Sequence, residues 1–103
     1  MQYCYVFRFS KTQEIIYISH LDLMRLFNRA ARRADLPLSL TQGYNPRFKI
    51  KLKRALKLGV VSQDEEGEFV LSEKINEDEL KIRWQSVLPP GLEITGVRFR
   101  DGN

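Results

Sequence analysis

The first segment of the chain, residues 2–9, is apolar at every position except Gln2 and Arg8, and aromatic and β-branched residues dominate it. This pattern and composition are typical of a β-strand. Alternation places Tyr3, Tyr5, Phe7 and Phe9 on one face of that strand. Because the opposite face also carries apolar side chains, we expect a central strand of a sheet.

A helical period replaces the alternation after Ser19, with apolar residues three or four positions apart through residues 23–34. Ser19 is a suitable N-cap, and Asp22 suits the first turn of the helix. The helix should end before Pro37, because the residue preceding a proline avoids the helical conformation.

The segments on either side of this helix give weaker signals. We expect a polar turn at residues 10–13 and a short extended strand at residues 14–18. After the helix, residues 38–42 alternate as a strand, and a turn follows at residues 43–46. Residues 47–53 have the clearest period of two in the chain, with basic side chains at every second position.

The second half of the chain repeats the order of strand, helix and strand. Residues 59–68 are acidic and predict a solvated loop, since their acids lack the ordered spacing of a metal-binding loop. A strand is expected at residues 68–73 and a helix from the N-cap Asn76, which Pro89 and the residues after it end. Residues 92–100 should form the last strand.

The elements therefore follow the order β-α-β-β-α-β. This order predicts an α+β fold of the ferredoxin-like split βαβ type, with an antiparallel sheet and two helices on one face. With 103 residues, the chain is expected to form a single domain, residues 1–103.

Composition excludes several classes of protein. No apolar run approaches the roughly 20 residues that a membrane span requires, and no signal peptide is recognisable at the N-terminus. Cys4 is the only cysteine, so no disulfide framework or cysteine-rich cluster motif is expected. We predict a cytoplasmic protein with no cofactor, no metal site and no membrane contact.

Charge is distributed unevenly along the chain, whose net charge is +4. Residues 1–57 carry twelve basic and three acidic side chains, whereas residues 58–103 carry five basic and ten acidic ones. The first part therefore has a net charge of +9 and the second of −5. Two interpretations are open: the basic part steers a polyanion to one side, or the two parts neutralise each other within the fold.

Two groups of basic residues are candidates for phosphate contacts. The first lies on the polar face of the predicted helix, and the second on one face of the strand at 47–53. The alternatives without a binding function are a solvated helix face for the first group and, for the second, an edge strand that lysines protect from unwanted pairing. Arginine forks and basic rows suit polyanions such as nucleic acid. The candidates are Arg25, Arg29, Arg32, Arg33, Arg47, Lys49, Lys51 and Lys53.

Three further features have a structural and a functional interpretation. The turn around Tyr44 and Asn45 is either purely structural or a contact to a base or sugar. The aromatic stripe of residues 3–9 is expected to face the core rather than to stack on bases, because the glycine-aromatic signature of RNA-binding modules is missing. His20, the only histidine, is expected to be packed or hydrogen-bonded, with acid/base chemistry or a phosphate contact as alternatives. Together with Ser19 and Asp22 it forms a helix cap rather than a catalytic triad.

Three blocks carry a resemblance to a known family: S-H-L-D-L-M-R at 19–25, R-A-A-R-R-A-D-L-P at 29–37 and Q-G-Y-N-P at 42–46. They resemble the radical SAM-linked domain family, a bacterial domain of unknown function found beside or fused to cobalamin-binding radical SAM proteins. The resemblance implies a cytoplasmic accessory domain and a radical SAM protein as partner. Arg47 and Phe48 stand where the family pattern continues with His-Pro, so a role of that histidine does not carry over.

Charge pattern and resemblance together predict a non-catalytic RNA-binding module for tRNA or rRNA. The alternative is a protein-interaction domain that docks on a radical SAM partner. A weaker alternative is an RNA-processing nuclease that uses His20.

Overall fold

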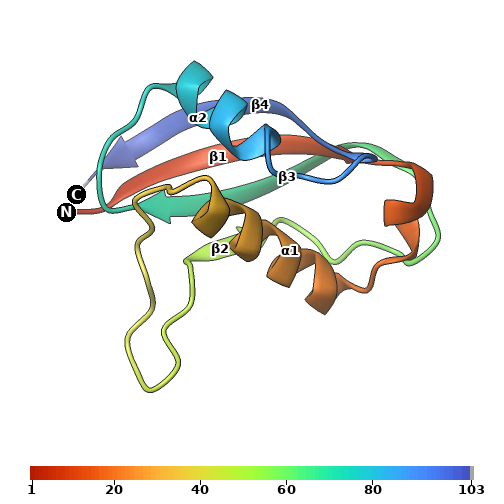
Figure 1. Cartoon of the computed structure of the whole chain (residues 1–103), viewed down its shortest axis with the longest axis horizontal. Coiled ribbons are helices and arrows are strands. Elements are labelled where there is room, and N and C mark those ends of the chain that lie inside the picture. Colours follow the sequence, from red (N-terminus) through yellow and green to blue (C-terminus); the bar gives the residue numbers. More distant parts are fainter. Residues whose placement is uncertain (103) are drawn as a thin grey trace.

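Residues 1–102, the part of the chain described by the computed structural model, form a four-stranded antiparallel sheet with two α-helices on one face (Figure 1). The strands lie in the order β2-β3-β1-β4. This topology confirms the predicted ferredoxin-like split βαβ fold. In chain order the elements are β1 (Tyr3–Lys11), the 3-10 helix η1 (Gln13–Tyr17), α1 (His20–Arg33), β2 (Ile50–Leu52), β3 (Ser62–Leu71), α2 (Glu77–Gln85) and β4 (Leu92–Gly102).

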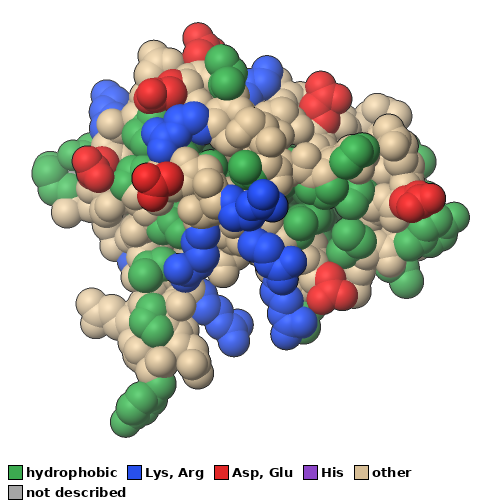
Figure 2. Space-filling model, viewed as in Figure 1, with side chains coloured by type: hydrophobic (Ala, Val, Ile, Leu, Met, Phe, Trp, Pro, Cys, Tyr) green, Lys and Arg blue, Asp and Glu red, His purple; other side chains and the backbone are tan. Residues whose placement is uncertain are grey.

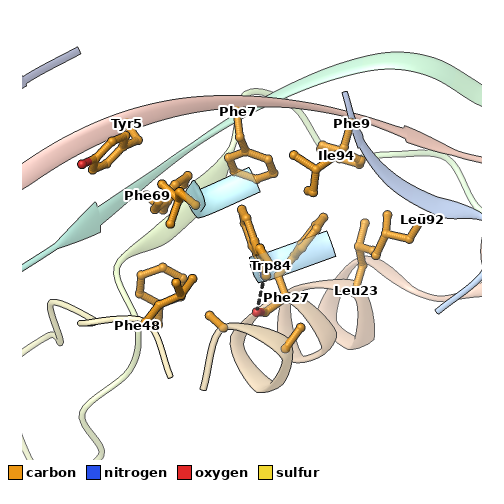
Figure 3. Close-up of a cluster of buried hydrophobic side chains, with 14 of the residues drawn as sticks. Tyr5, Phe7, Phe9, Leu23, Phe27, Phe48, Phe69, Trp84, Leu92 and Ile94 are labelled. Carbon is orange, nitrogen blue, oxygen red and sulfur yellow. Dashed lines mark hydrogen bonds between the residues drawn. The ribbon is translucent and has the colours of Figure 1, made fainter. Parts of the chain in front are cut away.

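β1 is a central strand, as predicted, because it pairs with β3 on one side and with β4 on the other. Its aromatic residues Tyr5, Phe7 and Phe9 are fully buried and point from the sheet toward the helices (Figure 3). The aromatic stripe is therefore a core element, as expected. Fully buried rings have no face left on which a base could stack.

Trp84 of α2 joins the two helices to the sheet. Its ring centroid lies 4.9 Å from that of Phe7 and 5.4 Å from that of Phe27 in α1. The indole Nε1 donates a hydrogen bond to the carbonyl oxygen of Phe27, 3.4 Å away (Figure 3). Because these rings form the centre of a small core, truncation of Trp84 to alanine should cost about 3–5 kcal/mol of stability.

Both α-helices begin at the predicted caps. Ser19 Oγ accepts a hydrogen bond from the backbone N–H of Asp22, and Asn76 Oδ1 accepts from the backbone N–H groups of Asp78 and Glu79. These bonds satisfy N–H groups that have no partner inside the helix. α1 ends two residues before Asp35, whose φ of 57° is incompatible with continuing the helix.

The expected strand at residues 14–18 is wrong, because these residues lie in η1 and only Ile15 among them is buried. The polar turn expected at residues 10–13 begins too early, since β1 extends through Lys11. The backbone N–H of Thr12 donates to the carbonyl oxygen of Gly91, 2.8 Å away. The chain turns there and leaves the sheet before a return strand can pair.

The two strands expected between residues 38 and 53 are mostly absent from the described structure. Residues 38–42 contribute only isolated bridges, Leu38 to Leu71 and Leu40 to Phe48, and β2 itself has three residues. β3 pairs with β2 only along Ile50–Leu52. The residues before β2 therefore have no continuous strand beside them, and they form a projecting loop instead (Figure 1).

The acidic loop expected at residues 59–68 is also wrong over most of its length, because β3 begins at Ser62. These acids pair with the second half of β1, in the register Arg8 to Glu66 and Phe9 to Glu65. Arg8 of β1 forms ion pairs with Asp64 and Glu66 of this segment. No helix among residues 1–102 is both long and apolar enough to cross a membrane.

Candidate nucleic-acid interface

The polar face of α1 presents four exposed arginines, as the helical period predicts. Its opposite face buries Leu23, Phe27, Ala30 and Ala31 against the core, which fixes the orientation of the helix. The four arginines are Arg25, Arg29, Arg32 and Arg33. They lie within nine positions of helix, which span roughly 12 Å along its axis at the usual rise per residue.

Few acidic groups neutralise this helix face. Arg25 Nη1 lies 3.4 Å from Asp22 Oδ1, and both side chains are well exposed. Arg32 Nε donates to the amide oxygen of Asn28, 3.3 Å away. Among residues 1–102, neither Arg29 nor Arg33 forms an ion pair with a carboxylate. The guanidinium groups of these two residues are therefore available to an external anion.

The loop between α1 and β2 projects from the body of the domain (Figure 1). Two hydrogen bonds between Thr41 and Arg47 close its tip. The backbone N–H of Thr41 donates to the carbonyl oxygen of Arg47 at 2.8 Å, and the backbone N–H of Arg47 donates to the side-chain Oγ1 of Thr41 at 3.0 Å. Gly43 has a φ of 123°, a conformation that other residues rarely adopt. Tyr44 and Asn45 lie at this tip and are exposed, the tyrosine completely so.

Lys and Arg side chains gather over α1 and continue beside the base of the projecting loop (Figure 2). Arg47 is exposed and directly precedes the buried Phe48. The α1 arginines and the loop residues 41–47 are named here the α1–loop surface. It combines cations with an exposed aromatic ring, which is the combination found in single-strand nucleic-acid sites.

The basic row of β2 lies on the other side of the sheet. Ile50 and Leu52 pack toward the core, so the side chains that alternate with them point away from the helices. Lys51 is opposite Glu68 in the register, and its Nζ lies 3.5 Å from the Glu68 carboxylate. Lys49 and Lys51 line a depression of the open sheet face with Cys4, Val70 and Arg100. Lys53 is exposed just beyond the end of β2.

The open sheet face is neutralised by ion pairs between the two parts of the chain. Arg8 of β1 contacts both Asp64, at 2.8 Å, and Glu66, at 2.7 Å. Hydrogen bonds from Arg8 hold the pKa of the Asp64 carboxyl below its ordinary value. Arg100 of β4 pairs with Glu68 in the same way. Neutralisation within the fold therefore occurs on this face, whereas the α1–loop surface keeps its charge.

His20 is the first residue of α1 and is exposed, so the expectation that it is packed is wrong. Within the described part of the chain its side chain makes no hydrogen bond, and no set of three His, Cys, Asp or Glu side chains is placed to hold a metal ion. The hydroxyl of the neighbouring Ser19 caps the helix. This arrangement is a helix cap, as predicted.

A family model described as an uncharacterized protein conserved in bacteria, DUF2344, matches residues 5–102. Comparisons with curated proteins and with solved structures gave no match. The match confirms the bacterial domain of unknown function that the sequence blocks resembled, while an association with radical SAM proteins stays a prediction. Because nearly the whole chain is matched, the protein belongs to the DUF2344 family of uncharacterised bacterial proteins.

Proposed function

We propose that this domain is a non-catalytic RNA-binding module that contacts phosphates through the α1–loop surface. The observation that carries the proposal is the row of four exposed arginines on α1, with Asp22 as their only ion-pair partner among residues 1–102. These guanidinium groups are accessible from solvent. The arginine fork matches the geometry of phosphate oxygens. A polyanion is the ligand that satisfies several of them at once.

The projecting loop would supply the contact to a base. Tyr44 is fully exposed at the loop tip, where its ring has both faces free. Stacking of a base on an exposed aromatic ring contributes about 1–3 kcal/mol. Asn45 beside it offers an amide donor and acceptor for a base edge or a sugar hydroxyl.

Lys49 and Lys51 have no phosphate contact in this proposal, because they lie on the open sheet face and Lys51 is paired with Glu68. Arg47 stays within it as part of the loop. The resemblance to radical SAM-linked domains supplies the cellular context. We place the domain in the cytoplasm, where it would present tRNA or rRNA to a radical SAM partner that modifies it.

A second candidate function is docking on a protein, and one feature favours it. A depression of about 330 Å³ beside α1 combines apolar side chains with two arginines. Protein interfaces also combine an apolar centre with arginine. An acidic, partly apolar surface of a radical SAM protein would fit this depression. Its lining is Leu26, Arg29, Ala30, Arg33, Ser86, Val87, Leu88 and Pro89.

Fluorescence anisotropy with labelled short RNAs, some derived from tRNA and some random, tests the RNA proposal. We expect dissociation constants in the micromolar range or below at low salt, a steep loss of affinity as salt rises, and intact RNA after incubation. The variant with Arg25, Arg29 and Arg32 changed to alanine should lose binding, while the wild-type fold is kept. No binding at low salt by folded protein would rule the proposal out and leave the docking function, which pull-down with the radical SAM partner tests.

A further inference from the structure

Lys11, at the end of β1, is a buried cation, with 1% of its surface exposed. Its Nζ donates one hydrogen bond, to the carbonyl oxygen of Lys57 at 3.0 Å. No carboxylate among residues 1–102 is in ion-pair contact with it. An ammonium group has three protons, so two of them have capacity for another acceptor. Burial lowers the pKa of this amine, which reflects how poorly its charge is solvated.

Lys11 lines a pocket of about 230 Å³ at the end of the sheet. Three neighbouring polar side chains of this pocket form hydrogen bonds with one another. Arg54 Nε donates to Glu65 at 2.9 Å, and the Ser62 hydroxyl donates to the same carboxylate. Glu65 is itself buried, so these bonds compensate its charge. Among the basic side chains that line the pocket, Lys11 is the buried one with free donor capacity, whereas Arg54 and Lys57 are exposed.

Apart from Lys57, the remaining residues of the pocket are apolar. Leu56, Val60 and Val61 line it, and the two valines are about half exposed at its mouth. The loop that carries them is held against η1, because Gly59 N–H donates to the carbonyl oxygen of Ile16 at 2.6 Å. The pocket therefore places an apolar mouth outside a buried positive charge.

We propose that this pocket binds the carboxylate of a ligand that carries a short apolar substituent, with Lys11 as its cation. A carboxylate offers the single negative charge and the acceptor oxygens that the free ammonium protons require. Glu65 repels any anion in this pocket, and it repels a phosphate dianion about twice as strongly as a carboxylate, so phosphate suits the pocket less well. The apolar substituent would contact Val60 and Val61. None of these residues belongs to the α1–loop surface, so RNA binding and carboxylate binding can each be contradicted without affecting the other.

Two-dimensional ¹H–¹⁵N NMR of the whole labelled chain tests this site with butyrate as the probe. Butyramide, its uncharged analogue, and inorganic phosphate are the controls. We expect saturable shifts of the amide signals of Lys11, Val60, Val61 and Ser62 with butyrate and none with butyramide. Peptides that end in leucine, with a free or an amidated carboxyl terminus, distinguish a protein terminus from a small acid as the source of the carboxylate.

Three variants, at two positions, test where the positive charge of the site lies. Lys11→Met should weaken butyrate binding about tenfold or more, because a hydrogen bond to a charged group is lost. Val61→Asp should weaken it too, while Val61→Asn, of the same size and at the same half-exposed position, should retain it. This second pair keeps the test valid if Lys11→Met does not fold. Equal shifts with butyramide, shifts with phosphate alone, or butyrate binding unaffected by Val61→Asp would overturn the proposal.

Discussion

Gly67 of β3 lies directly opposite Phe7 of β1, and the Phe7 ring occupies the space that a side chain at position 67 would need. A Cβ at this position would lie 2.5 Å from Phe7 Cε1 and 2.9 Å from the carbonyl oxygen of Lys51. The ring cannot move aside, because Phe27 and Trp84 pack against it. The centre of the aromatic core therefore depends on a residue without a side chain.

Replacing Gly67 with alanine should destabilise the fold by about 1–3 kcal/mol, the usual cost of overpacking a core. Urea unfolding followed by tryptophan fluorescence measures this, since Trp84 lies in the same cluster. Gly96→Ala in β4 is the matched control, because a Cβ there meets nothing within 4 Å. Equal unfolding midpoints of the two variants would contradict the assigned role of Gly67.

Tyr5 forms hydrogen bonds from inside the core to the connection between β3 and α2. Its hydroxyl donates to the carbonyl oxygen of Ile75 and accepts from the backbone N–H of the same residue, both at 2.9 Å. Tyr5→Phe keeps the ring stacked on Phe69 but leaves two backbone groups without a partner. We expect a loss of about 1–3 kcal/mol in thermal or urea unfolding. Tyr3→Phe, whose hydroxyl is on the surface, should change stability little by the same measurement.

Local signals in the sequence are sufficient to predict β1, α1 and α2. The caps Ser19 and Asn76, the helical period and the aromatic alternation each act within a few residues, and the structure agrees with all of them. The start of β3 is not predictable in this way. Ser62 to Glu66 have low strand propensity, but they pair with β1, whose Arg8 also forms an ion pair with Glu66. Pairing between distant segments overrides propensity there.

The residues of the candidate site are also only partly predictable from local signals in the sequence. The helical period correctly predicts the exposed arginines of α1, but it does not show how they lie relative to the lysines of β2. A signal for their separation is present in the sequence. Since both helices cover one sheet face and Ile50 and Leu52 face that core, Lys49 and Lys51 must point away from α1. The buried ammonium of Lys11 has no comparable signal, because its burial depends on the loop around Lys57.

Glu65 should make the stability of the fold sensitive to acid. Hydrogen bonds from Arg54 and Ser62 hold the pKa of its carboxyl below the ordinary value, although burial opposes this shift. A depressed folded-state pKa contributes stability above the unfolded pKa, near 4.5, and this contribution is lost as pH falls through the folded value. Urea midpoints from pH 7 to pH 3 should therefore fall more for the wild type than for Glu65→Gln. The pKa of the Asp64 carboxyl is also lowered in the fold by Arg8, so the difference between the two proteins is the quantity to compare. If the difference in urea midpoint between the wild type and Glu65→Gln does not shrink at low pH, the stabilising role of the Glu65 carboxylate is contradicted.

The two basic surfaces should differ in their effect on RNA affinity. Changing Arg25, Arg29 and Arg32 to alanine removes three exposed cations from the α1–loop surface. If each contacts a phosphate, the slope of log affinity against log salt should become less steep by about 2, at roughly 0.7 per contact with a single strand. Changing Lys49, Lys51 and Lys53 to alanine removes the same charge from the opposite side of the sheet. This control should leave the slope nearly unchanged.

Anisotropy titrations at four or five salt concentrations separate the possible results. An equal loss of slope in both triple variants would mean that RNA responds to total charge, and the assigned surface would then be wrong. Tyr44→Ala adds a test that net charge cannot explain, because it removes a fully exposed ring and no charge. We expect it to weaken binding about fivefold or more without changing the salt slope, since stacking releases no counterions. Unchanged affinity in Tyr44→Ala would remove the projecting loop from the interface and leave the phosphate contacts to α1 alone.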